Sequence, residues 1–188
     1  MKITSKKFVK GLIGDDDILG NDIPQIAFIG RSNVGKSTLI NTLTNSQLAR
    51  TSSFPGRTQE INIFLINDSF YLVDLPGYGY AINSGLGRER ISELIDSYLF
   101  NSLYTQKKIV FIIDASVGIT DKDTSMLHEL QNHHKDFLIV ANKVDKMTQS
   151  QYHKRMTEIK NVVGSHIIIP FSSKKKIGVK TLSNEIFN

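Results

Sequence analysis

The sequence predicts an α/β fold of three layers, with helices on both faces of a mostly parallel six-stranded sheet that holds one antiparallel strand. Two observations support this class. Short apolar runs alternate along the chain with longer amphipathic stretches, as expected for repeated strand–helix–strand units. A tight-turn signal, Asn67-Asp68-Ser69, joins two of the apolar runs directly, so those two strands are expected to form an antiparallel hairpin.

The elements follow in order from the spacing of their apolar residues. The first strand is predicted over 26–29, and a glycine-bounded loop then leads into a helix over 36–44. The hairpin strands are predicted over 61–66 and 70–74. In the rest of the chain, helices have apolar residues three or four positions apart, whereas strands are continuous apolar runs. The remaining helices are expected over 88–101, 121–132, 152–163 and 179–187, and the remaining strands over 109–114, 137–141 and 167–170.

Residues 21–188 are expected to form a single domain, preceded by an N-terminal arm over residues 1–20. Two segments inside this domain, 45–60 and 77–87, fit neither the helical nor the strand period. Long loops inside a compact domain are usually functional, so both segments are candidates for parts that respond to a ligand.

Composition narrows the class of protein. With 188 residues, 40% hydrophobic and 22% charged, the chain is similar to ordinary soluble globular domains, and we expect a monomer. No apolar run reaches the roughly 18–20 residues of a membrane span, and the N-terminus lacks a secretory-signal pattern. We therefore expect a cytoplasmic protein with no membrane partner. The absence of cysteine excludes disulfides and thiolate metal sites.

The formal net charge of +5 is compatible with an RNA-rich partner or with an ordinary solvated surface. Lys174, Lys175 and Lys176 form a tight basic run, and the same two interpretations apply to it.

Residues 30–37 match the phosphate-binding pattern G-x-x-x-x-G-K-[ST] in full, between a predicted strand and a predicted helix. Glycines at both ends of the loop allow its N–H groups to turn toward the β- and γ-phosphates of a nucleotide at the helix N-terminus. Lys36 is expected to act on these phosphates as the catalytic point charge, and the Ser37 hydroxyl to bind Mg²⁺. The predicted phosphate-binding residues are Gly30, Arg31, Ser32, Asn33, Val34, Gly35, Lys36, Ser37 and Thr38.

A second motif, Asp74-Leu75-Pro76-Gly77, follows the second strand of the hairpin. Asp74 is expected to hold Mg²⁺ through a water molecule, and the Gly77 N–H to face the γ-phosphate. Thr58 lies in the loop between the two motifs and is the candidate for a second protein hydroxyl on the metal. The predicted nucleotide-binding residues of this region are Gly56, Arg57, Thr58, Gln59, Glu60, Asp74, Leu75, Pro76 and Gly77.

Base selection is assigned to Asn142-Lys143-Val144-Asp145, which follows an apolar strand. Guanine presents two donors, N1–H and the exocyclic N2–H, that the Asp145 carboxylate can accept together. Adenine would leave this carboxylate buried without a partner. Asn142 is expected to contact the Hoogsteen edge of the base and to tie neighbouring loops together, and Lys143 to lie along the base plane. Phe171-Ser172-Ser173, after the last strand, can present a backbone N–H to guanine O6.

In this order the motifs resemble the translation-factor-related class of P-loop GTPases, and closely resemble the EngB-type (YihA/YsxC) bacterial GTPases. The likeness covers about residues 22–188. Its most specific part is the run Asp-Leu-Pro-Gly-Tyr-Gly-Tyr-Ala over 74–81, and it also includes 24–37, 49–59 and 171–173. Asn142 is a departure, because the family often has threonine there, but it leaves the prediction of guanine unchanged.

The resemblance implies a G domain that binds GTP and GDP with Mg²⁺ and hydrolyses GTP. It also implies a role in assembly of the large ribosomal subunit and in normal cell division and septation. The implied partner is the precursor of that subunit, including its rRNA and protein. In this interpretation, 45–60 is switch I and 77–87 is switch II, ordered through Thr58 and Gly77 when the γ-phosphate is present.

Hydrolysis is expected to be slow, on the order of the unassisted Ras rate of ~10⁻⁴–10⁻³ s⁻¹ or modestly above it. Signalling GTPases place a water-orienting glutamine directly after the glycine of D-x-x-G, whereas this chain has Tyr78. Arg57 lies near the phosphates, but a structural or switch-related role is favoured over that of an arginine finger. Asn33 either ties the phosphate loop together or helps to seat a K⁺ ion that replaces such a finger.

Three other functions stay open. The chain could be a binding module whose hydrolysis is incidental. It could be a P-loop kinase or ATPase, against which the residues 142–145 argue. It could also act in cell division through a membrane or septal partner, although the sequence shows no amphipathic anchor or lipidation motif for that.

Overall fold

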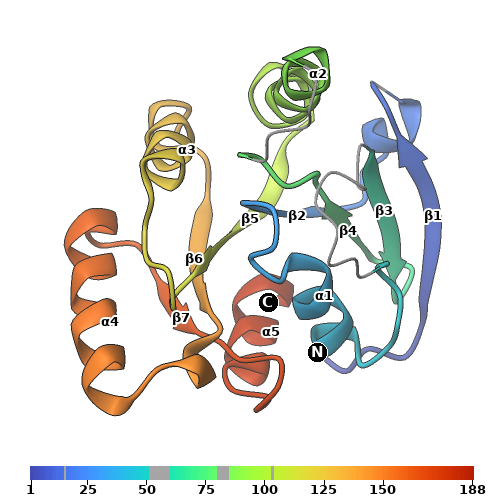
Figure 1. Ribbon diagram of the computed structural model, residues 1–188. Coiled ribbons are helices and arrows are strands. Elements are labelled where there is room, and N and C mark those ends of the chain that lie inside the picture. The colour runs from blue at the N-terminus through green and yellow to red at the C-terminus, as the bar shows by residue number, and fades with distance from the viewer. Residues whose placement is uncertain (15, 51–59, 80–84, 103) are drawn as a thin grey trace.

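A seven-stranded sheet forms the centre of the molecule, with strand order β1-β3-β4-β2-β5-β6-β7 (Figure 1). The computed structural model describes residues 1–14, 16–50, 60–79, 85–102 and 104–188. The strands are β1 (Lys6–Leu12), β2 (Gln25–Gly30), β3 (Ile61–Ile66), β4 (Phe70–Asp74), β5 (Gln106–Asp114), β6 (Phe137–Asn142) and β7 (Ile168–Pro170).

The predicted α/β class is confirmed, with one correction to the number of strands. Strand β3 is antiparallel to both of its neighbours, β1 and β4, whereas β2 pairs in parallel with β4 and β5. The sheet thus has one antiparallel strand, as predicted, but seven strands instead of six. The additional strand is β1, which lies within the segment expected to form an arm over residues 1–20.

Helices cover both faces of the sheet. One face carries α1 (Lys36–Thr44) and α5 (Val179–Phe187). The other carries α2 (Gly85–Asp96), α3 (Asp121–Asn132) and α4 (Gln149–Val163). Side chains alternate between the two faces along β2, so that Ala27 packs in one core and Phe28 in the other. The described residues also include the short helical turns η1 (Asp17–Gly20), the π-helical η2 (Ser97–Asn101) and η3 (Val144–Lys146).

Several element boundaries differ from the sequence prediction. The helix expected from residue 88 begins at Gly85, so it includes the end of the segment 77–87. Helix α4 begins at Gln149 instead of residue 152, because Thr148 and Gln151 form a capping box there. The predicted hairpin turn is present, and both Asn67 and Asp68 have a φ of 51°. These two residue types tolerate the left-handed conformation that such a turn needs.

The parallel strands place the predicted motifs at one edge of the sheet. Phe28 pairs with Asp74, and Asp114 pairs with Asn142, so β2, β4, β5 and β6 all end together. Ligands of open α/β sheets bind at this carboxyl edge. In the described part of the chain, no helix is long and apolar enough to cross a membrane.

Candidate functional site

The loop between β2 and α1 has the backbone that a phosphate site requires. Gly35 has a φ of 93° and Asn33 a φ of 67°, and both angles lie in the left-handed region. A Cβ on Gly30 would stand 2.5 Å from the carbonyl oxygen of Ile112, so glycine is required where β2 passes β5. The loop then enters α1 at Lys36, which directs the N-terminal end of the helix toward the loop's interior.

Three predicted residues meet at the end of this loop. The Lys36 ammonium donates a hydrogen bond to Asp74 Oδ1, and the two side chains form a buried ion pair. The Ser37 hydroxyl donates to the other carboxylate oxygen, Asp74 Oδ2, over 3.4 Å. The structure therefore brings together three of the residues expected to bind phosphate and metal, although they come from α1 and β4.

This donor set fits Mg²⁺. The ion prefers oxygen ligands, and in nucleotide sites it takes one or two from the protein while phosphates and water supply the others. The Ser37 hydroxyl and the Asp74 carboxylate converge in this way. The described residues contain no cluster of three or more His, Cys, Asp or Glu side chains of the kind that forms an all-protein metal cage.

The base-selecting motif is tied to the phosphate loop by side-chain contacts. The Asn142 amide donates to the Val34 carbonyl over 2.8 Å, and the Lys143 ammonium donates to the Asn33 carbonyl over 2.6 Å. Asn142 therefore ties neighbouring loops together, which is part of what the sequence indicated. Lys143 is in the left-handed conformation, with a φ of 64°.

Asp145 and the segment after β7 form the far end of the site. The Ser172 hydroxyl donates to Asp145 Oδ1 over 2.6 Å, which fixes the carboxylate's orientation. The Val144 N–H donates to the Phe171 carbonyl over 3.2 Å and holds the two loops together. Ser173 Oγ is buried and has no hydrogen-bond partner in the part of the chain that the structure describes. A buried hydroxyl of this kind is typical of a site that receives a polar ligand.

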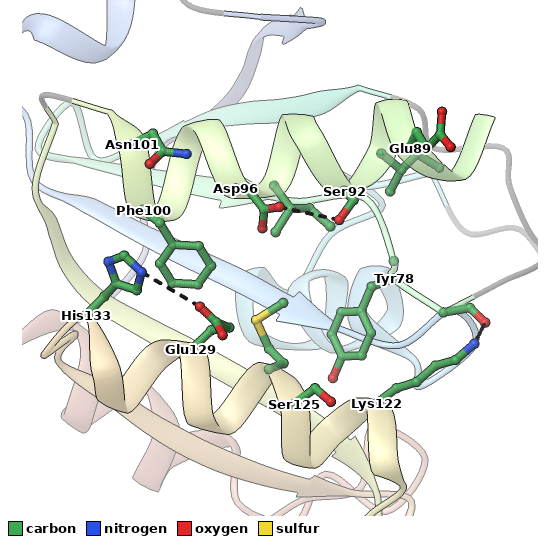
Figure 2. Close-up of a pocket in the computed structure, with 15 residues that line it drawn as sticks. Tyr78, Glu89, Ser92, Asp96, Phe100, Asn101, Lys122, Ser125, Glu129 and His133 are labelled. Carbon is green, nitrogen blue, oxygen red and sulfur yellow. Dashed lines mark hydrogen bonds and ion pairs between the residues drawn. The ribbon is translucent and has the colours of Figure 1, made fainter. Parts of the chain in front are cut away.

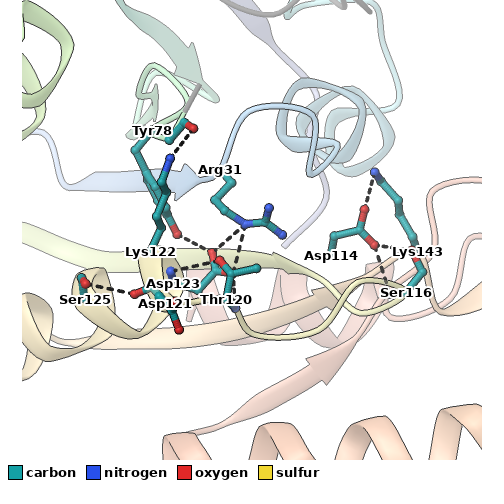
Figure 3. Close-up of polar contacts among 11 residues, drawn as sticks. Arg31, Tyr78, Asp114, Ser116, Thr120, Asp121, Lys122, Asp123, Ser125 and Lys143 are labelled. Atoms are coloured by element: carbon teal, nitrogen blue, oxygen red, sulfur yellow. Dashed lines mark hydrogen bonds and ion pairs between the residues drawn. The ribbon is translucent and has the colours of Figure 1, made fainter. Parts of the chain in front are cut away.

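A buried carboxylate that sequence reasoning missed connects the phosphate loop to the residues after Asp74 (Figure 3). Asp123 on α3 is only 1% exposed. It accepts hydrogen bonds from Arg31 Nε at 3.0 Å and from the Tyr78 hydroxyl at 2.8 Å. The Thr120 N–H and hydroxyl also donate to it, at 2.9 and 2.8 Å. Thr120 and Asp123 form a capping box at the start of α3, but this local pattern does not reveal the contacts with Arg31 and Tyr78, which are 92 and 45 residues away.

The environment of Tyr78 decides what its hydroxyl can do. Burial raises the pKa of this hydroxyl strongly, and the negative charge and hydrogen bond of Asp123 raise it further. The group therefore stays protonated and serves as a hydrogen-bond donor to Asp123. It is unsuited to act as a general base toward water.

Asp114 is a second residue that sequence reasoning did not assign to the site. Burial alone would raise the pKa of its carboxyl, but hydrogen bonds from Lys143 and Ser116 outweigh that effect and lower the pKa overall. The Lys143 ammonium lies 2.6 Å from Asp114 Oδ2. The position of Asp114 at the end of β5, between β2 and β6, is the signal that could have identified it, since ligand sites gather at that edge.

The other predicted residues are placed as follows. Ser32 contacts Gly77 and Tyr78, because its N–H donates to the Tyr78 carbonyl and its hydroxyl to the Gly77 carbonyl. Leu75 is buried, Thr38 is exposed, and Glu60 is exposed just before β3. Four predicted residues, Gly56, Arg57, Thr58 and Gln59, lie outside the described residues.

Comparisons with known proteins agree on one family. Residues 25–143 match the family model described as 50S ribosome-binding GTPase. The probable GTP-binding protein EngB of Lactobacillus helveticus (strain DPC 4571) is 41% identical, over 99% of this chain and 97% of that protein.

Two solved structures show the same fold. A crystal structure of a probable GTP-binding protein EngB superposes with a TM-score of 0.73 at 25% identity, and covers 87% of this chain and 96% of that one. Era of Aquifex aeolicus bound to GDP.AlF4⁻ also has a TM-score of 0.73, at 24% identity, and covers 87% of this chain and 56% of that one. The likeness to Era concerns the fold alone.

Proposed function

The chain belongs to the 50S ribosome-binding GTPase family and, within it, to the EngB-type GTP-binding proteins. On this basis we propose that it is a switch protein that hydrolyses GTP slowly and acts in assembly of the large ribosomal subunit. We also propose that normal cell division and septation depend on it. The main support for a nucleotide ligand is that the residues proposed to bind its phosphates and those proposed to bind its base lie at the same edge of the sheet. Lys36 and Ser37 stand at the phosphate end, and Asp145 stands at the base end beside Ser172.

At the base end, Asp145 accepts the N1–H and N2–H groups of guanine, while Ser172 holds its Oδ1 in place. The buried Ser173 hydroxyl supplies a further polar group near the same loop. An adenine base offers no donor pair, and the desolvated carboxylate then has no partner. Guanine over adenine is therefore the proposed preference.

At the phosphate end, Lys36 exchanges Asp74 for the oxygens of the β- and γ-phosphates and stabilises the charge that develops during transfer. Ser37 and Thr58 are the proposed protein ligands of Mg²⁺, with Asp74 acting through water. The ion supplies charge neutralisation at the phosphate oxygens.

The proposed rate is slow because no described side chain near the phosphate end is placed to orient the attacking water. Tyr78 follows the glycine of the second motif, but its hydroxyl is committed to Asp123. We expect turnover on the order of ~10⁻⁴–10⁻³ s⁻¹ or modestly above it, measured as phosphate release from the purified protein. Tens of turnovers per second without a partner would contradict this proposal.

Residues 45–60 and 77–87 are the proposed switches. Gly77 already lies against the phosphate loop, where a Cβ on it would stand 2.9 Å from the backbone of Ser32. A γ-phosphate bound at the phosphate loop would therefore lie close enough to contact this segment. Limited proteolysis of the chain loaded with a GTP analogue or with GDP tests the proposal. Identical cleavage patterns in the two states would count against it.

Potassium is a further proposed cofactor, because Asn33 stands in the phosphate loop with its carbonyl held by Lys143. Hydrolysis is measured in K⁺ and in Na⁺ at matched ionic strength. We expect faster turnover in K⁺, and equal rates would remove the potassium proposal without affecting the rest.

The ribosomal partner is tested by co-sedimentation with purified large subunits in the presence of a GTP analogue, GDP or no nucleotide. We expect the most protein in the pellet with the GTP analogue. A net charge of +5 supports attraction to an RNA-rich particle. We propose a cytoplasmic monomer with no membrane partner as the acting form. Pelleting that is absent in all three states would refute the ribosomal role.

A further inference from the structure

A groove of about 730 Å³ separates α2 and η2 from α3 (Figure 2). It lies on the sheet face opposite α1 and α5. The backbone of Gly77–Gly79 closes one end of the groove, so it begins directly beside the phosphate site. Neither Lys36 nor Asp145 lines it, and the nucleotide proposal does not use it.

The floor of the groove is apolar. Ile91 comes from α2, Phe100 from η2 and Met126 from α3, and all three are packed against the core but only partly buried. Figure 2 shows the Phe100 ring directed into the space between the two helices. A partly exposed apolar floor inside a groove is typical of a site that receives an apolar side chain.

The rim of the groove carries an excess of negative charge. Asp96 on α2 faces Glu129 on α3 across it, and Glu89 lines the groove nearer the start of α2. This local excess is unexpected on a chain whose formal net charge is +5.

The two basic residues of the rim are already engaged. The Lys122 ammonium donates to the Gly79 carbonyl over 2.7 Å. His133 Nε2 lies 3.8 Å from Glu129 Oε2, and its ring centroid is 4.6 Å from that of Phe100. The carboxylates Glu89 and Asp96 have no ion-pair partner among the described residues.

The pKa of the Asp96 carboxyl is affected by these neighbouring charges. Burial raises the pKa of its carboxyl, a hydrogen bond from Ser92 lowers it in part, and repulsion from Glu129 raises it again. A cation that entered the groove would relieve this repulsion and favour the ionised form.

We propose that the groove binds a protein segment that presents arginine or lysine side chains around one apolar side chain. The apolar side chain contacts Phe100 and Met126, and the basic side chains pair with Glu89, Asp96 and Glu129. RNA is disfavoured, because the carboxylates repel its phosphates. The proposal rests on the proposed function in one respect, which is that the segment belongs to a protein of the large ribosomal subunit.

The first experiment does not depend on ribosomes. A fluorescein-labelled peptide with a central leucine flanked by arginines is titrated with the full chain, loaded with GTP analogue or with GDP. A peptide with glutamates in place of the arginines is the control. We expect saturable anisotropy with the arginine peptide only, in at least one nucleotide state. Absence of binding, or equal binding of both peptides, would overturn the proposal.

A charge-reversal series locates the binding site. Glu129→Lys is expected to lower the affinity for the arginine peptide by about tenfold or more. Glu185→Lys changes the net charge equally but lies on α5, on the opposite face, and is expected to leave binding unchanged. If Glu129→Lys fails to bind GTP normally, Glu89→Lys is used instead, because Glu89 is exposed. Equal effects in the groove and control variants would refute the assigned site.

The second experiment identifies the source of the segment. A photo-crosslinking amino acid replaces Ser92 in the groove or Thr181 on α5, and each protein is bound to purified large subunits. Crosslinks from position 92 to a ribosomal protein support the proposal. Crosslinks to rRNA or to a second copy of the chain overturn it while leaving ribosome binding intact. Subunits that bind neither protein refute the proposed function, and the peptide titration then decides the groove separately.

Discussion

At the scale of single residues, the proposed recognition of guanine depends on the Asp145 carboxylate, whose orientation is set by Ser172. The Ser172 hydroxyl occupies Asp145 Oδ1, so the group that reads the base is held before the base arrives. Such preorganisation reduces the entropy that binding must overcome.

The first prediction exchanges this acceptor for a donor. Asp145→Asn is expected to weaken GTP by about 1–3 kcal/mol, or roughly tenfold to a hundredfold, because guanine's donors then face an amide N–H₂. The same variant should bind xanthosine triphosphate better, since xanthine has a carbonyl where guanine has its exocyclic amine. Competition against labelled GDP measures both effects. Unchanged preference between the two nucleotides would contradict the assignment of Asp145.

The second prediction concerns the buried carboxylate of Asp123. Asp123→Asn should lower the free energy of unfolding by about 3 kcal/mol, because Arg31 and Tyr78 lose a charged partner in a desolvated site. Tyr78→Phe removes one neutral donor and should cost about 1 kcal/mol. Urea denaturation measures both values. Tyr104→Phe is the control, because that hydroxyl reaches Asp16 only at 3.5 Å and should cost less than about 0.5 kcal/mol.

The residues that the sequence revealed are those that lie in contiguous motifs. Lys36, Ser37 and Asp74 could be assigned because each motif keeps fixed spacing and follows a strand, and the structure places them in contact. Asp123 could not be assigned, because its role arises only when α3 is folded against the phosphate loop. The contacts of Asp123 with Arg31 and Tyr78 are a property of packing and leave no pattern near Asp123 in the chain.

At the scale of elements, the edge strand β1 is the part that the sequence did not predict. Its sequence, KKFVKGL, includes three lysines, and all three are exposed. Lysines on an edge strand hinder unwanted pairing with other chains, but they also hide the apolar signal by which strands are recognised. The strand nevertheless pairs with β3 over its whole length, with a register shift between Phe8 and Lys10.

The third prediction tests whether β1 is part of the folded domain. Leu12 is 3% exposed and packs in the core, whereas Phe8 is 54% exposed. Leu12→Ala should lower the free energy of unfolding by about 3 kcal/mol, and Phe8→Ala by less than about 1 kcal/mol. Chemical denaturation followed by circular dichroism measures both. A negligible effect of Leu12→Ala would mean that β1 detaches without loss of stability, as an arm would.

At the scale of the whole molecule, stability should depend on the charge state of the sheet edge. The pKa of Asp114 is lowered in the folded chain, so its ionised form is the one that folding favours. A carboxyl with a lowered pKa in the folded chain makes the chain more stable as the pH rises. The stabilisation is fully present above the unfolded pKa of about 3.9 and is lost as the pH falls through the lower, folded value.

The fourth prediction compares the acid unfolding of two proteins. Asp114→Asn should be less stable than the parent chain at pH 7, because Lys143 loses its 2.6 Å partner. The difference between them should shrink as the pH falls below about 4 and then through the lowered pKa of the folded parent, where its carboxyl becomes protonated too. Thermal melting across this pH range measures the difference. A gap that stays constant down to the acid limit would show that the Asp114 charge is unimportant.

The buried contact between Lys36 and Asp74 has a consequence for the binding of the two proposed ligands, a nucleotide and Mg²⁺. A triphosphate that captures the ammonium sets the carboxylate free, and a divalent ion that engages the carboxylate sets the ammonium free. Binding of either ligand therefore frees the group that the other ligand needs. By thermodynamic reciprocity, each ligand should raise the affinity for the other by the same factor. Chelating the metal should accordingly hasten nucleotide escape, and withdrawing nucleotide should hasten loss of the metal.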